Sequence, residues 1–227
     1  DGENYYFTET QKTIARIHQI PSEYLEMLWS QGENSVKTTK GLVLELKGEL
    51  CEQGNPFDMP PVGNLSKGEG FSLELMIEPS LLKNDQILLD TRREKTTGYG
   101  TDAKFAGNGI VIRILSSGAM EFIMDDGRSP LIWNSGPGII KSGESNHLVI
   151  NVDAKAKMVT FVINGDLWDG GNRPFGYARF NPYMYDVNGA QDVSFSKDFK
   201  GKIETFRVYD RFLYTSEAIS NFLISAP

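Results

Sequence analysis

The sequence has few of the residues on which many sites and cross-links depend. Its 227 residues include one cysteine, Cys51, and two histidines, His18 and His147. A single cysteine excludes an intramolecular disulfide, and two distant histidines without a cysteine pair leave little material for a zinc site. A compact domain of this size buries about 70% of its unfolded-chain surface, so its core needs neither disulfides nor metal.

Basic charge and long apolar runs are also scarce. Acidic residues outnumber basic ones, 30 to 23, which gives a net charge of −7. No block of lysine and arginine is present, which argues against nucleic acid, because its partners neutralise phosphates with basic side chains. No apolar run approaches the roughly 18 residues that span a bilayer, so membrane insertion is not expected.

What the sequence does contain points to β structure. Aromatic residues make up 11% of the chain, beside 23 glycines and 10 prolines, which is typical of a turn-rich β protein. Apolar and polar side chains alternate over residues 71–78, which predicts a half-buried strand. The same kind of pattern predicts strands over residues 42–46, 86–91, 109–115, 120–124, 147–152, 158–163 and 202–209.

These strands predict the fold class. The links 116–119 and 153–157 are short enough for hairpins between antiparallel neighbours. Strands without interleaved helices exclude a parallel α/β sheet, so we expect an all-β, antiparallel two-sheet jelly-roll sandwich. Two longer stretches, 49–70 and 94–108, are predicted to be loops that serve a function or move.

Short helices are expected at both ends of the sandwich. Apolar residues in the first thirty positions recur at spacings of three and four, which predicts a helical N-terminal segment. Residues 1–40 are therefore expected to form a helical extension packed on the sandwich, with a linker from an upstream domain as the alternative. Residues 41–227 form the jelly-roll domain, closed by a short helix over residues 215–222, whose first turn is acidic.

The last strand carries a family resemblance. The run Gly201-Lys-Ile-Glu-Thr-Phe-Arg-Val-Tyr-Asp-Arg-Phe-Leu213, the Ser216-Glu-Ala-Ile219 after it, and residues 71–78, 147–153 and 159–165 resemble the concanavalin A-like lectin/glucanase superfamily. The similarity is to its laminin-G-like jelly rolls and covers residues 41–222. It implies a non-catalytic, carbohydrate-binding or accessory module of a secreted or surface bacterial protein, and hence an extracellular, cell-surface or periplasmic location.

Catalytic motifs are lacking. The same fold hosts glycoside hydrolases, but Glu74 and Glu78 stand four residues apart on one strand face, a separation of roughly 13 Å. Retaining and inverting carboxylate pairs need about 5 Å and about 6.5–9.5 Å. Neither a G-x-S-x-G motif nor a phosphate-binding glycine pattern is present. We therefore predict that the chain is not an enzyme, with a polysaccharide hydrolase or lyase of the same fold as the weaker alternative.

Two stretches combine aromatic faces with the hydrogen-bonding side chains that sugar binding requires. In the first, a tight turn at Asn164-Gly165 and a glycine pair are expected to expose Trp168. Burial of this indole is the alternative. The predicted ligand-binding residues are Trp168, Asp169, Asn172 and Arg173, followed by Asp126 and Trp133 in the second stretch, with Tyr177, Tyr183 and Tyr185 as further rim aromatics.

A third stretch offers oxygen ligands for a metal. Asp186, Asn188 and Asp192 surround a glycine in one short loop, and calcium accepts carboxylate and amide oxygens of this kind. These residues predict a structural calcium ion, with turn capping by Asp186 and Asn188 as the alternative.

The partner expected from all of this is a neutral poly- or oligosaccharide or a neighbouring domain of a larger protein, because the negative net charge disfavours polyanions. A structural or protein-interaction domain is therefore the alternative to a sugar-binding module.

Overall fold

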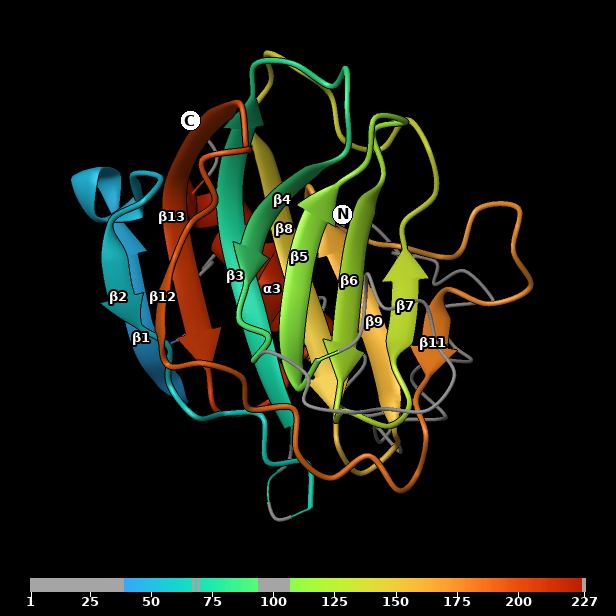
Figure 1. Ribbon diagram of the computed structural model, residues 1–227. Helices are drawn as coiled ribbons and strands as arrows, with labels where there is room; N and C mark the ends of the chain where they lie inside the picture. Colours follow the sequence, from blue (N-terminus) through green and yellow to red (C-terminus); the bar gives the residue numbers. More distant parts are fainter. Residues whose placement is uncertain (1–38, 67, 69, 94–106, 226–227) are drawn as a thin grey trace.

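The computed structural model describes residues 39–66, 68, 70–93 and 107–225, and two of its sheets face each other as a sandwich (Figure 1). The larger sheet has the order β1–β13–β3–β8–β9–β10, and β11 also pairs with β9. Its strands are β1 (Leu42–Lys47), β3 (Gly70–Pro79), β8 (Asn146–Asp153), β9 (Met158–Ile163), β10 (Asp166–Leu167), β11 (Tyr177–Arg179) and β13 (Gly201–Tyr209).

The second layer is a four-stranded sheet in the order β4–β5–β6–β7, and a small sheet of two strands lies beside the sandwich (Figure 1). The second layer consists of β4 (Gln86–Asp90), β5 (Gly109–Ile114), β6 (Met120–Asp125) and β7 (Leu131–Asn134). The small sheet consists of β2 (Pro56–Asp58) and β12 (Asp192–Ser194). All pairs are antiparallel, which confirms the predicted jelly-roll sandwich and both predicted hairpins.

The apolar face of β3 lies in the core, but the prediction of a half-buried strand is wrong. Phe71, Leu73, Leu75 and Ile77 all lie in the main apolar cluster of the sandwich. The opposite face of β3 is buried as well, because other parts of the chain cover it. The exception is Glu78, whose side chain is partly exposed. Alternation predicted the two faces correctly but not that the polar face would be covered.

A β-bulge corrects the expected faces of β13. Strict alternation would place Ile203 on the same face as Arg207 and Tyr209. The register against β3 shifts between Ile203 and Thr205, and Ile203 instead joins Phe206 and Val208 in the core. One extra residue in a strand reverses the faces beyond it, and no local pattern in the sequence marks where this bulge lies.

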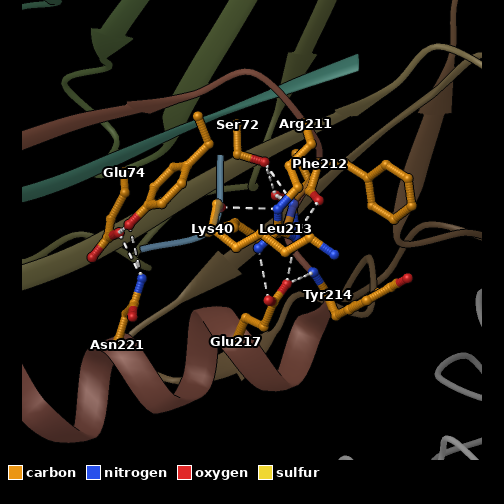
Figure 2. A network of polar contacts seen from close by, with 11 residues as sticks. Lys40, Ser72, Glu74, Arg211, Phe212, Leu213, Tyr214, Glu217 and Asn221 are labelled. Carbon is orange, nitrogen blue, oxygen red and sulfur yellow. Dashed lines mark hydrogen bonds and ion pairs between the residues drawn. The ribbon is translucent and has the colours of Figure 1, made fainter. Parts of the chain in front are cut away.

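The helix α3 (Thr215–Ser225) confirms the predicted closing helix and lies against the outer face of the larger sheet (Figure 1). Ala218 is buried in a second apolar cluster with Val149 and Val162 of the sheet. The start of the helix is held by Glu217, whose carboxylate accepts hydrogen bonds from Arg211 and from the backbone N–H of Tyr214 (Figure 2). Asn221 of this helix reaches Glu74 on the polar face of β3, and Leu213, just before the helix, bonds to Ser72 on the same face.

The predicted loop over residues 49–70 contains regular structure, which corrects that prediction. It holds the 3-10 helix η1 (Gly48–Cys51), which begins just before it, and strand β2. Three residues are too few to show a strand period, so β2 is recognisable only from its pairing with β12. Most of the predicted N-terminal extension, and residues 94–106 of the second predicted loop, lie outside the described residues.

Candidate functional site

Two connecting segments, 59–65 and 181–191, cross one end of the sandwich, the lowermost in Figure 1. We call this the lower end; β3 and β5 begin there, and β4 and β6 end there. The segments are joined by backbone hydrogen bonds, from Leu65 N–H to Tyr185 O (2.8 Å), from Val187 N–H to Gly63 O (2.9 Å) and from Met59 N–H to Gln191 O (2.7 Å). Backbone pairing of this kind holds irregular segments in place without a long strand.

A pocket of about 170 Å³ opens between these two segments. Apolar side chains, such as those of Phe71 at the start of β3 and Ile110 in β5, share its wall with polar groups. Among the described residues, Arg93, just after β4, is the single charged one in the lining. The Nε of Arg93 donates to Gly189 O at 3.0 Å, and the backbone N–H of Arg93 donates to Asn108 O at 2.9 Å. The sequence did not single out Arg93, because nothing near it forms a recognisable motif.

Exposed aromatic rings lie at the same end. Tyr183 is 69% exposed and Tyr185 is 45% exposed, and their rings meet edge to face with centroids 6.4 Å apart. Arg128, in the turn between β6 and β7, donates to Tyr183 O at 3.1 Å. The ammonium of Lys157 lies 6.0 Å from the centre of the Tyr185 ring. Two accessible aromatic faces with charged donors beside them provide the combination that sugar binding requires.

The predicted ligand residue Asp126 lies at this end, where its carboxylate shapes a turn. It accepts hydrogen bonds from the backbone N–H of Arg128 (3.0 Å) and of Ser129 (3.2 Å). The guanidinium of Arg128 also pairs with it at 2.8 Å. Asp126 therefore orients the arginine that contacts the Tyr183 backbone.

The residues predicted to bind calcium are placed in and beside the segment 181–191. Asp186 accepts from Asn188 N–H at 2.8 Å, and Asn188 Oδ1 accepts from Gly63 N–H at 2.8 Å. Asp192 lies in β12 opposite Asp58. Within the described part of the chain, no three histidine, cysteine, aspartate or glutamate side chains are grouped for a metal ion. Asp186 thus caps its own turn and Asn188 joins the two segments, and calcium binding stays a prediction.

The other predicted sugar site lies apart, along one side of the sandwich. Trp168 is 8% exposed and belongs to the core, so the expectation that the turn exposes it is wrong. The turn itself is as predicted, with positive φ at Asn164 (52°) and Gly165 (81°). The chain pairs back onto β9 directly afterwards through β10, which carries the indole inward to contact Phe161.

Trp133 and Arg173 join Trp168 in what we call the side cluster. The two indoles meet edge to face at 5.4 Å, and the guanidinium of Arg173 lies 4.7 Å from the Trp133 ring centre. Arg173 also donates to Asn134 O at 2.7 Å and to the Asn134 side chain. Five of the six predicted ligand residues are thus neighbours in space or sequence, but Asp169 and Asn172 are exposed while the Trp168 indole is buried. Their role in sugar binding stays a prediction.

A closed polar network lies beneath α3, on the polar face of the larger sheet. The Glu74 carboxylate accepts four hydrogen bonds, from His147 Nε2 (2.9 Å), Tyr209 OH (2.7 Å), Asn221 Nδ2 of α3 (2.8 Å) and Arg207. Figure 2 shows Asn221 reaching from the helix to Glu74. Arg207 has a second partner in Glu45, at 2.7 Å. All four partners and Glu74 are buried.

Burial and partners act in opposite directions on the pKa of Glu74. Desolvation raises the pKa, but the His147 hydrogen bond and the Arg207 charge outweigh it, so the pKa lies below its ordinary value of 4.5. For Tyr209, burial followed by the Glu74 charge raises the pKa. The carboxylate is therefore ionised and the phenol neutral at pH 7, and both are closed off by the helix. The network anchors α3 on the sheet.

No helix among the described residues combines the length and the apolar character that a bilayer span needs.

Solved structures similar to this one share its fold at low sequence identity. The CBM40 of the Ruminococcus gnavus IT-sialidase, bound to α2,3-sialyllactose, has a TM-score of 0.56 and 18% identity, covering 79% of this chain and 98% of that chain. A leech intramolecular trans-sialidase complexed with 2,7-anhydro-Neu5Ac has a TM-score of 0.57 and 16% identity, covering 84% and 29%. The binding domain of botulinum neurotoxin serotype G has a TM-score of 0.53 and 13% identity, covering 85% and 47%.

A comparison with curated protein sequences finds no match. The family model described as "Concanavalin A-like lectin/glucanases superfamily" matches residues 53–219. The match includes most of the described sandwich and agrees with the resemblance carried by β3, β8, β9 and β13. The chain belongs to the concanavalin A-like lectin/glucanases superfamily.

Proposed function

We propose that the chain is a non-catalytic carbohydrate-binding module that holds its glycan at the lower end of the sandwich. The observation that carries this proposal is the exposed pair Tyr183 and Tyr185, with Arg128 and Lys157 beside it. Sugar rings stack on open aromatic faces, and neighbouring charged donors fix their hydroxyl groups. The side cluster offers less open aromatic surface, because Trp168 is buried.

The similar solved structures support the proposal. The module from Ruminococcus gnavus is a CBM40 and is bound to sialyllactose, and the botulinum structure is a binding domain. Glycan binding also fits a module that works outside the cell, where polysaccharides and glycoconjugates are accessible, and we propose that location. The polar network beneath α3 gives no support to catalysis, because its carboxylate is closed off by the helix.

A glycan array tests this proposal. The array should contain neutral glycans and acidic ones, each acidic glycan beside its counterpart without the acidic group. We expect at least one glycan family to bind, and Tyr183→Ala to weaken that binding about tenfold, which corresponds to ~1.4 kcal/mol. The melting temperature should hardly change, because an exposed side chain contributes within about 0.5 kcal/mol to stability.

Phe175 provides the matched control. It is 50% exposed and stacks on Tyr177 at 5.2 Å, away from the pocket lining. Phe175→Ala should leave glycan affinity unchanged. An array without any bound glycan would refute sugar binding and favour the protein-interaction alternative. Loss of binding in Phe175→Ala but not in Tyr183→Ala would move the site to the aromatic pair of Phe175 and Tyr177.

A further inference from the structure

The charge of the pocket at the lower end is opposite to that of the whole protein. The chain carries a net charge of −7, yet Arg93 is the single charged residue in the pocket lining within the part of the chain that the structure describes. Asp58, Asp186 and Asp192 are close to lining residues in sequence, and none of them lines the pocket. An anion that enters it therefore meets one guanidinium and no carboxylate.

Arg93 differs from its neighbour in having no acidic partner. Arg92 forms an ion pair with Asp90 at 2.5 Å. No carboxylate of the described residues lies within ion-pair distance of Arg93. Its Nε is engaged by Gly189 O, which leaves the two terminal nitrogens of the guanidinium as donors. Two such nitrogens match the two oxygens of a carboxylate or a sulfate.

Close backbone packing builds the pocket around this arginine. A Cβ at Gly63 would lie 2.7 Å from the backbone nitrogen of Asn188, and a Cβ at Gly189 would lie 1.8 Å from Thr91 O. Glycine at both positions thus allows the segments to approach each other and the end of β4. Apolar side chains such as Phe71 and Ile110 form part of the wall, and a charge-assisted hydrogen bond is stronger where water is partly excluded.

The size of the pocket limits what it can hold. A cavity of ~150 Å³ accommodates a six-membered ring, and this pocket measures about 170 Å³. It therefore has room for the acidic substituent of a sugar residue, while the rest of an oligosaccharide would extend across the surface.

We propose that this pocket binds the acidic group of an anionic glycan, a carboxylate or a sulfate, through Arg93. The proposal rests on the proposed glycan-binding function and names the substrate class. It departs from the neutral glycan expected from the net charge, because recognition depends on the local charge of the pocket.

Calorimetry on matched glycan pairs tests this inference in the full chain. 3′-Sulfolactose differs from lactose by its sulfate alone, and 3′-sialyllactose differs from its own methyl ester by the charge of its carboxylate alone; if another family binds on the array, its own matched pair replaces them. We expect the acidic member of each pair to bind at least tenfold more tightly than the neutral one. The affinities of the sialylated and the sulfated glycan then show whether a carboxylate or a sulfate is preferred. Raising the salt concentration should reduce this preference.

Substitutions at and near Arg93 separate the pocket from general charge effects. Arg93→Met should bring the affinity for the acidic glycan down to that for the neutral one and leave the latter unchanged, while Arg93→Lys should keep part of the preference. Gln191→Glu, on an exposed lining residue, should weaken only the acidic glycan. Arg179→Met is the control, because Arg179 is exposed in β11 at the same end but does not line the pocket.

The outcomes distinguish this inference from the proposed function. Equal binding of acidic and neutral glycans, or an acidic preference that survives Arg93→Met, would overturn the inference and leave glycan binding intact. A preference that disappears in Arg179→Met as strongly as in Arg93→Met would also overturn it, because it would reflect overall charge. The absence of any glycan binding would overturn both proposals.

Discussion

The network beneath α3 and the lower end of the sandwich both gather charged and aromatic side chains, yet they differ in how these groups are paired. Beneath α3, the two oxygens of Glu74 accept four hydrogen bonds, and Arg207 has two acidic partners. At the lower end, Tyr183 and Tyr185 are exposed, and Arg93 has no acidic partner among the described residues.

This difference separates stability from recognition. A buried charge costs free energy unless it is paired and hydrogen-bonded, so a fully satisfied network persists as part of the fold. Exposed side chains with spare hydrogen-bonding capacity add little to stability and keep that capacity for a ligand. Substitutions beneath α3 should therefore change the free energy of unfolding, whereas substitutions at the lower end should change glycan affinity.

The largest expected effect is that of Glu74→Ala. It leaves Arg207 and the hydroxyl of Tyr209 buried without their shared acceptor, which should lower the free energy of unfolding by about 3–5 kcal/mol. Chemical denaturation measures this change, and Tyr183→Ala is the comparison, expected within about 0.5 kcal/mol of wild type. If the two variants were equally stable, the division between the two regions would be wrong.

The side cluster tests where the boundary between the two regions lies. Trp168→Ala should cost about 3 kcal/mol, at the lower end of the range for a large aromatic, because the indole lies at the edge of the core. Glycan affinity, measured at a temperature at which the variant stays folded, should not change. A stable Trp168→Ala variant that loses its glycan would instead place the sugar site at the side cluster.

The sequence predicted the fold well, because the information for it is local. Alternation in β3, the short hairpin links and the Asn164-Gly165 turn each depend on a few adjacent residues, and the structure confirms all three. The bulge in β13 was missed, because its position depends on pairing with β3. The exposure of Trp168 was wrong for a similar reason, since the pairing of β10 with β9 turns it inward.

The candidate site was only partly predictable. Tyr183 and Tyr185 were identified as rim aromatics, and both are exposed. The pocket was missed, because its wall joins residues near 60, 90 and 190 that no sequence window contains together. Residues 49–70, predicted to be a functional or mobile loop, supply one side of it. The role of Glu74 was equally hidden, since its partner Asn221 is 147 residues away along the chain.

The smallest effect expected from the network beneath α3 is the pH dependence of the free energy of unfolding. Because the pKa of Glu74 is lower in the folded protein than its ordinary value of 4.5, ionisation of this group stabilises the fold. That contribution is complete above about pH 4.5 and is lost as the pH falls through the lower, folded-state pKa. It is smaller than the effect of Glu74→Ala, because a protonated carboxyl group keeps part of its hydrogen bonding.

Wild type should therefore lose stability between pH 5 and pH 3 more steeply than Glu74→Gln, as measured by urea denaturation across this range. Arg93→Met, which removes a charge at the lower end, should retain the wild-type slope. Parallel slopes for wild type and Glu74→Gln would show that the buried carboxylate is not what couples the stability of this fold to pH.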